Sequence, residues 1–330
     1  MKLWKIGYAA MGILFAACSI VTGEYGLAKT DREIYDTAVS LDSGDMGFAT
    51  FSLRDYKVRF YNGKYDYVVV PGDEPEAPPK IVKEEAVLDV FAGTTIDVDG
   101  EYQVLLPTYE QFSRLFEVLG TAETVSQGMS EGTMAFTEDS YSRNSQAATI
   151  WHEAFHAWQY TNWQEEIDAL TERMRLSAEE SREDIIVREV DSDQEMVTTF
   201  EQEMKLLMEA YEETVPERKK EKIKQVLELA GQREKHLSDS VNAMEYFLEN
   251  LEGSAMYVEG MAYRKLEGEA AFKEYYLDDF SYENGSGKYY HLGMLKCLSL
   301  DEMLPGWQSR FAADYGLDEL LCECVENVSD

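Results

Sequence analysis

Residues 146–160 read QAATIWHEAFHAWQY. Apolar residues surround a His-Glu-x-x-His pattern formed by His152, Glu153 and His156, which is typical of a buried helix, and Ser145 is a candidate N-cap. Side chains four residues apart project from one face of a helix, one turn along. Because two imidazoles placed in this way can reach one zinc ion, the stretch predicts a metal-binding helix.

Glu153 is placed to act on a water molecule at that metal without being a ligand itself. Its carboxylate can take the water's proton, which is the role of a general base. The chain has only four histidines. Of the other two, His236 is predicted to be a surface residue, and His291 is a lesser candidate for the site. The alternative is a pair of histidines packed on a helix, and it gives Glu153 no role.

The third ligand is expected to be a carboxylate. A catalytic zinc site has three protein ligands and an open position, and no histidine follows at short spacing. Glu252 opens the segment EGSAMYVE, in which Gly253 and Ala255 would let a second helix approach the first closely. Glu259 lies two turns later on the same face and is predicted to hydrogen-bond the far nitrogen of a ligand histidine. Glu249, one turn before Glu252, is the rival ligand.

These two stretches together resemble the zinc motifs of gluzincin metallopeptidases, the thermolysin-like clan. The aminopeptidases of that clan carry Asn-Glu-Gly-Phe-Ala-x-Tyr-x-Glu, and the resemblance places Glu252 on the ligand, Tyr257 on the aromatic residue and Glu259 on the second acid. Leu251 replaces the Asn, and Ser254 replaces the Phe. The resemblance covers two helical segments only. It implies a zincin (gluzincin-like) fold of the α+β class, a bound Zn²⁺ and hydrolysis of amide bonds in a peptide or protein substrate.

The chain also departs from the aminopeptidase pattern. Its two motifs are separated by a much longer segment, which residues 165–248 fill with a charged helical hairpin broken at Pro216. The Gly-Ala-Met-Glu-Asn motif is absent, so recognition of a free amino terminus is not expected. Thr133 to Thr137 are a candidate edge strand for peptide docking. Tyr290 resembles the downstream tyrosine that stabilises the oxyanion in many gluzincins, with ordinary packing as the alternative.

The N-terminal half carries strand signals. Asn62-Gly63 and Asp99-Gly100 suit tight turns, each between two short apolar runs, and Thr108 and Gln111 have the spacing of a capping box. We expect one catalytic domain over residues 29–330, made of a β-rich part (29–144), the metal helix (145–164), the helical hairpin (165–248), and the Glu-ligand helix with the C-terminal helices (249–330), the last of which are predicted at 288–303 and 308–322.

Charge and cysteine content exclude several classes of protein. The chain has 64 acidic and 30 basic residues, a formal charge of −34, which argues against electrostatic binding to nucleic acid or to an anionic membrane. Of its four cysteines, Cys297, Cys322 and Cys324 lie outside the N-terminal segment, and none forms a C-x-x-C pair. A disulfide from Cys297 to the C-terminal tail remains open.

Residues 1–28 have the layout of an export signal. Two lysines precede an apolar run over residues 6–21, as in a signal peptide that would be cut after Ala28. Lipidation at Cys18 and an uncleaved membrane anchor are the two alternatives. All three place the body of the protein outside the cytoplasm, with membrane contact only through this segment.

The sequence therefore predicts a zinc-dependent peptidase that acts outside the cytoplasm. The competing hypothesis is a catalytically silent, zincin-like binding module that displays its acidic hairpin at the cell surface. An intact Glu153 favours the enzyme, since a purely structural metal site needs no base. Substrate, cleavage position and oligomeric state stay open at this level.

Overall fold

The computed structural model describes residues 26–42, 46–48, 50–72, 77–120, 142–174, 181–278 and 281–326. Both predicted hairpins are present. They consist of β1 (Val58–Tyr61) with β2 (Tyr65–Val70) and β4 (Thr94–Val98) with β5 (Glu101–Pro107). Gly63 has a φ of 90°, and Asp99 and Gly100 have φ values of 56° and 84°, as tight turns require. The export signal through residue 25 and the candidate edge strand at 133–137 lie outside the described residues.

The five strands form one mixed sheet in the order β3-β2-β1-β5-β4. β1 pairs in parallel with β5, and the other neighbours pair antiparallel. β3 (Lys80–Glu85) was not predicted, because it is an edge strand with exposed charged residues and little apolar alternation. β4 forms the opposite edge, which is the edge nearest to the metal helix.

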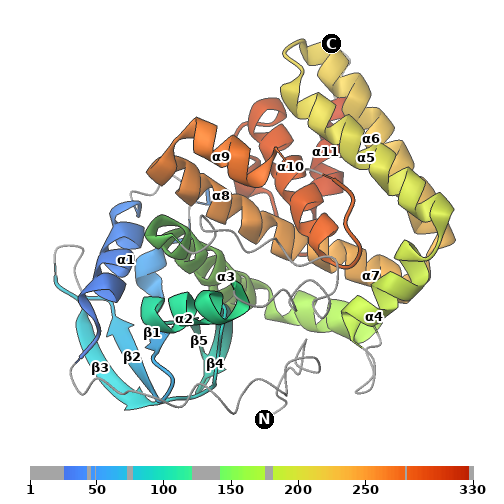
Figure 1. Ribbon diagram of the computed structural model, residues 1–330. Helices are drawn as coiled ribbons and strands as arrows, with labels where there is room; N and C mark the ends of the chain where they lie inside the picture. Colours follow the sequence, from blue (N-terminus) through green and yellow to red (C-terminus); the bar gives the residue numbers. More distant parts are fainter. Residues whose placement is uncertain are drawn as a thin grey trace.

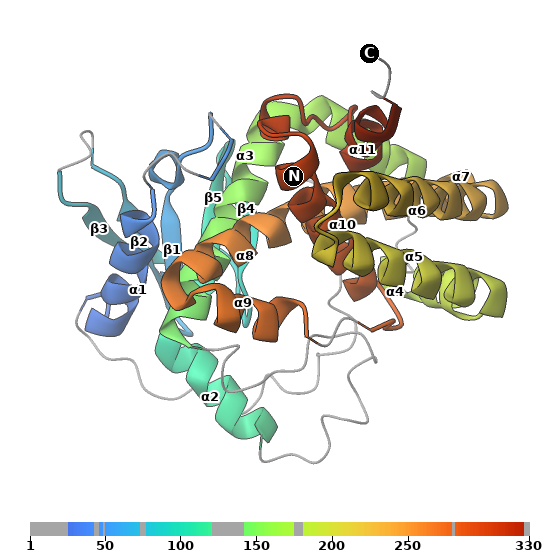
Figure 2. The ribbon, with the colours of Figure 1, turned by 90° about the horizontal axis from the view of Figure 1, so that it is seen from above.

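One face of the sheet carries the main hydrophobic core. Alternate strand residues such as Phe60, Val69 and Leu106 belong to a core that also includes Ile34 and Trp151 of two covering helices. These helices are α1 (Lys29–Ser40) and α3 (Arg143–Met174), joined by a hydrogen bond from the Trp151 indole to the carbonyl of Ala38 at 3.0 Å. α3 lies between the sheet and the C-terminal helices (Figure 2). The same core continues through the helical half.

The second half of the chain is almost entirely helical (Figure 1). Its elements are α4 (Arg182–Ile186), a π-helix (Val187–Asp191), α5 (Gln194–Glu212), α6 (Pro216–His236), α7 (Asp239–Phe247), a second π-helix (Leu248–Glu252), α8 (Gly253–Glu267), α9 (Glu269–Tyr276), α10 (Gly287–Met303) and α11 (Leu317–Glu326). The N-terminal half adds α2 (Tyr109–Gly120), and two short 3₁₀ helices span Leu53–Asp55 and Trp307–Ser309. The fold class is therefore α+β, as predicted.

The helical hairpin is real but shorter than predicted. α5 and α6 pack side by side, with Pro216 at the first turn of α6. The expected second arm ends early because Ser238 caps a new helix, accepting a hydrogen bond from the Val241 backbone N–H at 3.3 Å. The helix predicted over 308–322 is also wrong in its first half, where a bridge between Ala312 and Tyr315 marks non-helical backbone.

The structure differs from the prediction at two helix starts and answers the open question of a disulfide. α3 begins before Ser145, and Ser142 accepts the hydrogen bond from the Ser145 backbone N–H at 3.0 Å, so Ser142 acts as the cap. Thr108 does accept from the Gln111 N–H, at 3.4 Å, but the Gln111 side chain turns to the carbonyl of Asn62 and does not complete a capping box. Cys297, Cys322 and Cys324 are all free thiols, so no disulfide joins Cys297 to the tail.

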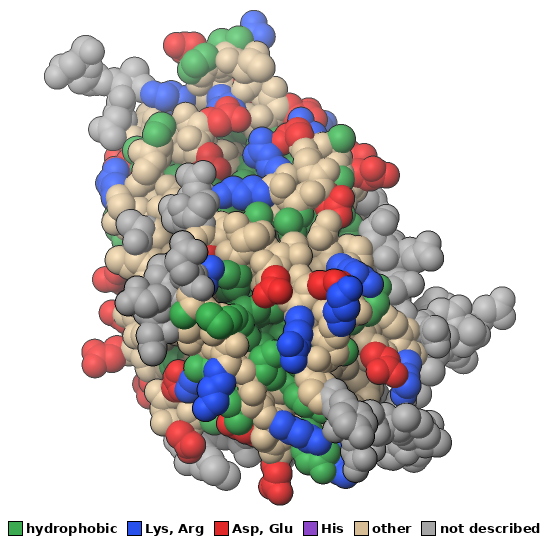
Figure 3. Space-filling model, turned by 90° about the vertical axis from the view of Figure 1, so that its left-hand side faces the viewer, with side chains coloured by type: hydrophobic (Ala, Val, Ile, Leu, Met, Phe, Trp, Pro, Cys, Tyr) green, Lys and Arg blue, Asp and Glu red, His purple; other side chains and the backbone are tan. Residues whose placement is uncertain are grey.

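Surface charge and hydropathy add two observations. On the face shown in Figure 3, acidic and basic side chains are interspersed around a hydrophobic area. Among the described residues, no helix has both the length and the apolar character needed to cross a membrane.

Candidate metal centre

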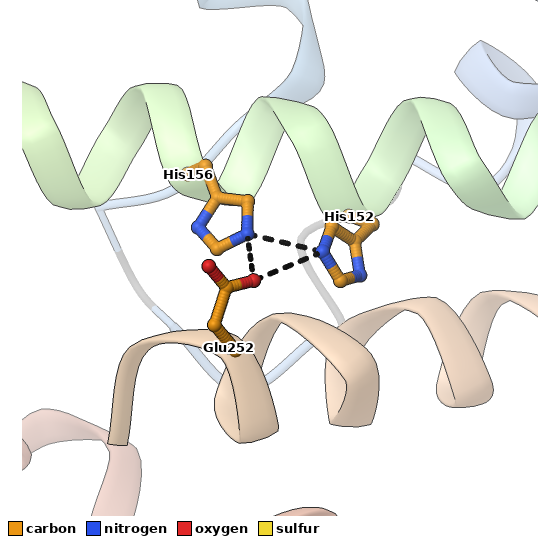
Figure 4. Close-up of side chains that lie close together, drawn as sticks. All are labelled: His152, His156 and Glu252. Carbon is orange, nitrogen blue, oxygen red and sulfur yellow. Dashed lines mark hydrogen bonds and ion pairs between the residues drawn. The ribbon is translucent and has the colours of Figure 1, made fainter. Parts of the chain in front are cut away.

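The two histidines of α3 and Glu252 converge on one point, as the sequence predicts (Figure 4). His156 Nε2 lies 3.0 Å from His152 Nε2 and 3.0 Å from Glu252 Oε2. His152 Nε2 lies 3.8 Å from the same carboxylate oxygen. All three residues offer one ligand atom within a sphere small enough for a single ion, and the three side chains are largely buried.

The Nδ1 atom of each histidine, on the far side of the ring from the ligand point, already has a hydrogen-bond partner. His152 Nδ1 lies 2.9 Å from Glu259 Oε2, which is the contact predicted from the sequence. His156 Nδ1 lies 2.7 Å from the Oε1 of Gln159, a residue that the sequence analysis missed. The Gln159 amide nitrogen donates to the carbonyl of Leu251 at 3.0 Å, and this bond fixes which end of the amide faces His156.

These contacts determine where the lone pairs point. A carboxylate and an amide oxygen are acceptors only, so Nδ1 of both histidines carries the proton in the neutral rings. Each Nε2 then presents a lone pair toward the other and toward Glu252. Three lone-pair donors that face one another repel unless a cation or a shared proton lies between them. The arrangement therefore fits a cation.

When no metal ion is bound, a proton on a histidine can take the place of the cation. Burial alone would lower the pKa of His152, but its hydrogen bonds to Glu252 and Glu259 outweigh burial and raise the pKa well above the usual value. Burial likewise works to raise the pKa of Glu252, but the neighbouring His156 and His152 outweigh it and hold the pKa well below the usual value. The carboxylate is thus kept ionised, the state in which it can bind a metal.

Glu252 reaches this point from the last residue of a π-helix. The helix Leu248–Glu252 leads directly into α8, whose first residue, Gly253, lies against α10. A Cβ at Gly253 would lie 2.6 Å from the Cα of Gly293, so both helices need glycine there. The predicted packing of α8 along α3 is present, but the close approach at Gly253 itself is with α10.

Glu249, the rival ligand, is engaged elsewhere. Its carboxylate accepts from Lys296 Nζ at 2.5 Å and lies 3.6 Å from an Arg233 nitrogen. It therefore belongs to a buried charge network between the helices, and it is not part of the group with His152 and His156.

The side chain of Glu153 extends from α3 toward the edge strand β4. The Thr95 hydroxyl is 3.0 Å from Glu153 Oε2 and 2.6 Å from the Glu153 carbonyl oxygen. A Cβ at Gly93 would come within 3.2 Å of the Glu153 carboxylate, so glycine leaves space for this side chain. Burial raises the pKa of Glu153, which moves a carboxylate toward the range useful for proton transfer near neutral pH.

Two tyrosines lie beside the metal-binding group. Tyr290 is on α10, and burial and the adjacent Glu252, with which its hydroxyl forms a hydrogen bond, raise its pKa well above the usual value. Tyr160 follows His156 by one turn of α3, with ring centroids 6.3 Å apart, and burial with the charge of Glu252 raises its pKa too. Both hydroxyls consequently stay protonated. Tyr160 was not predicted, although its position four residues after His156 places it on the same helical face.

The remaining two histidines lie away from the ligand point. His236 is exposed on α6, where its Nδ1 lies 2.8 Å from the Gln232 carbonyl, so it is a surface residue as predicted. His291 is half-buried on α10, and burial lowers its pKa to about 4.

A cavity of about 630 Å³ lies next to Tyr160, but the metal-binding residues and Glu153 do not line it. Tyr160 forms part of its wall together with Tyr102, whose ring stacks on Tyr160 with centroids 5.2 Å apart. The rest of the wall comes from Thr50, Asp55 and Tyr56, from the β4–β5 turn, and from α3 on both sides of a kink at Trp163, where φ is −128° and ψ is 27°.

Comparison of the chain with protein-family models, curated proteins and solved structures finds no match. The geometry of the described residues is therefore the basis for proposing a function.

Proposed function

We propose that this protein is a zinc-dependent hydrolase of peptide bonds that acts outside the cytoplasm, with a gluzincin-like site. The observation that carries the proposal is the convergence of two imidazole lone pairs and one ionised carboxylate beside a buried Glu153. Ligand atoms about 2.0–2.1 Å from a tetrahedral zinc ion lie roughly 3.3 Å apart. The separations of 3.0, 3.0 and 3.8 Å suit that size.

Each residue then has a distinct role. His152, His156 and Glu252 would hold the ion, which when bound acts as a Lewis acid on a carbonyl and lowers the pKa of a water molecule. Glu153 takes the proton of the attacking water and returns it to the leaving amine. Tyr290 and Tyr160 keep their protons and can donate hydrogen bonds to the oxyanion.

The edge strand β4 supports a peptide as the substrate. Within the described residues, no strand pairs with the outer edge of β4, and Thr95 of this strand contacts Glu153. An extended peptide that adds to this edge by backbone hydrogen bonds would run past the base. We therefore assign peptide docking to β4, while the candidate strand Thr133–Thr137 lies outside the described residues.

The proposal is tested with Glu153→Gln. This variant keeps the size of the side chain but cannot accept a proton, so we expect full zinc content and a kcat lowered by about 100-fold or more. Zinc is measured by atomic emission on the purified protein, and hydrolysis on a library of fluorogenic peptides. Glu166→Gln, on an exposed position of the same helix, is the matched control and should keep both properties.

Two results would contradict the proposal. A wild-type protein without zinc would remove its basis. A protein that holds zinc but hydrolyses no peptide in the library would favour the competing hypothesis of a silent binding module.

A further inference from the structure

Arg182 is a half-buried cation that has no anionic partner among the described residues, and its Nη1 atom is fully buried. Although acidic residues outnumber basic ones by 64 to 30 in this chain, Arg182 forms no hydrogen bond or ion pair in the part of the chain that the structure describes. Its Nη1 is one of few buried side-chain atoms without a partner. Burying a donor without a hydrogen-bond partner is unfavourable, and more so when the group is charged. A buried guanidinium nitrogen without a partner, in a strongly acidic protein, points to a ligand.

The position of Arg182 is fixed by its neighbours on α4. Ser181 and Asp184 form a capping box at the start of the helix. Glu183 accepts a hydrogen bond from the Ser286 N–H at 3.1 Å, which attaches α4 to the residue preceding α10. Asp191 strengthens this attachment by accepting from Lys288 Nζ at 2.8 Å.

The same neighbours place the guanidinium beside the metal centre. Tyr290 lies one turn into α10, next to the attachment of Glu183. The guanidinium carbon lies 4.8 Å from the ring centroid of Phe247, the residue directly before the π-helix that ends at Glu252. Its positive charge also acts to lower the pKa of Tyr160 and Tyr290, as expected for a cation close to both hydroxyls.

We propose that Arg182 binds a carboxylate of the peptide substrate and thereby sets the position of cleavage. The planar guanidinium presents paired N–H groups that match the two oxygens of a carboxylate. Two sources share this chemistry: the free C-terminus of the peptide and an Asp or Glu side chain. The inference rests on the proposed peptidase function, because it assigns a recognition group to that same site.

The test measures binding, so that it does not depend on turnover. In the Glu153→Gln background, loaded with zinc, calorimetry would compare one peptide as the C-terminal acid, as the C-terminal amide, and as the amide with Glu in place of Gln near its end. We expect a carboxylate-bearing peptide to bind roughly 10- to 100-fold more tightly than its neutral counterpart. Whether the acid or the Glu-containing amide shows this gain identifies the source.

Substitutions at Arg182 complete the design. Arg182→Gln should abolish the preference, and Arg182→Lys should keep part of it, because lysine retains the charge but not the paired donors. Arg188→Gln, on an exposed position a short distance along the chain, should leave the preference unchanged. Equal weakening of acid and amide binding in Arg182→Gln would mean that Arg182 only packs on Phe247, and would overturn the proposal.

Failure of this inference differs from failure of the proposed function. A zinc-loaded, active protein with no preference for carboxylates refutes the role of Arg182 alone. A protein that lacks zinc and activity, but still prefers the carboxylate peptide through Arg182, refutes the peptidase and leaves the carboxylate site in place.

Discussion

Glu249 and Glu252 lie one turn apart on the same π-helix, yet their surroundings are opposite. Glu249 faces two cations, with Lys296 at 2.5 Å and Arg233 at 3.6 Å. Glu252 faces lone pairs of imidazole rings, with His156 Nε2 at 3.0 Å. The comparison shows that the charge of the neighbours, and not the residue type or its burial, separates a structural carboxylate from one that can bind a metal.

The network around Glu249 joins two cations to four carboxylates. Arg233 pairs with Glu203 at 2.9 Å and with Glu245 at 2.6 Å, and Lys296 also reaches Asp318 at 2.7 Å. Burying such ions is costly, and the cost is offset only when every ion has partners of good geometry. This network links α5, α6, α10 and α11 to the π-helix, which places Glu252. The structural region thus supports the metal-binding region.

The largest effect is expected from Lys296→Met, which removes one of the two cations of this network. Glu249 and Asp318 would lose their closest cation while Glu249 remains buried, and removing one partner of a buried ion pair costs about 3–5 kcal/mol. The free energy of unfolding in urea measures this loss. Lys205→Met, at a side chain that is 77% exposed, should change it by less than about 0.5 kcal/mol. Equal effects of the two substitutions would show that the network does not stabilise the fold.

Glu252→Gln tests the other side of the comparison and should have the next largest effect. An amide oxygen is a much weaker zinc ligand than a carboxylate, so zinc affinity should fall by more than about 100-fold. Glu249→Gln is the matched variant and should behave in reverse, losing stability and keeping its zinc. Chelator competition and urea unfolding on both variants measure the pair. If Glu249→Gln were the one to lose zinc, the ligand assignment would be wrong.

Local patterns made much of this site predictable. His152, Glu153 and His156 follow from helical spacing alone, and Glu259 follows from its distance along the same helix face as Glu252. The hairpins at Asn62-Gly63 and Asp99-Gly100 were predictable for a similar reason, because the turn chemistry lies within two residues.

Contacts between distant segments were not predictable. Thr95 and Gly93 reach Glu153 across the sheet edge, and nothing in their own surroundings in the sequence marks them as site residues. Arg182 was missed because a basic residue on a charged helix usually faces solvent, and only tertiary packing shows that it has no partner. Gln159 had a usable signal, since it lies one turn after His156, but an amide on a helix rarely indicates a metal site.

The smallest of these effects, and the finest test of the comparison, is expected from the residues that orient the ligands. Glu259→Gln keeps an oxygen that can accept from His152 Nδ1 but removes the charge, so zinc affinity should fall by roughly 10- to 100-fold. The loss should lie below that of Glu252→Gln because all three ligands remain. Competition with a chelator of known affinity measures it, and Glu267→Gln, an exposed position on the same helix, should have no effect. An unchanged zinc affinity in Glu259→Gln would mean that the hydrogen bond alone orients His152 and that the charge of Glu259 adds nothing. Glu259 would then act on the His152 ring as the neutral Gln159 acts on the His156 ring.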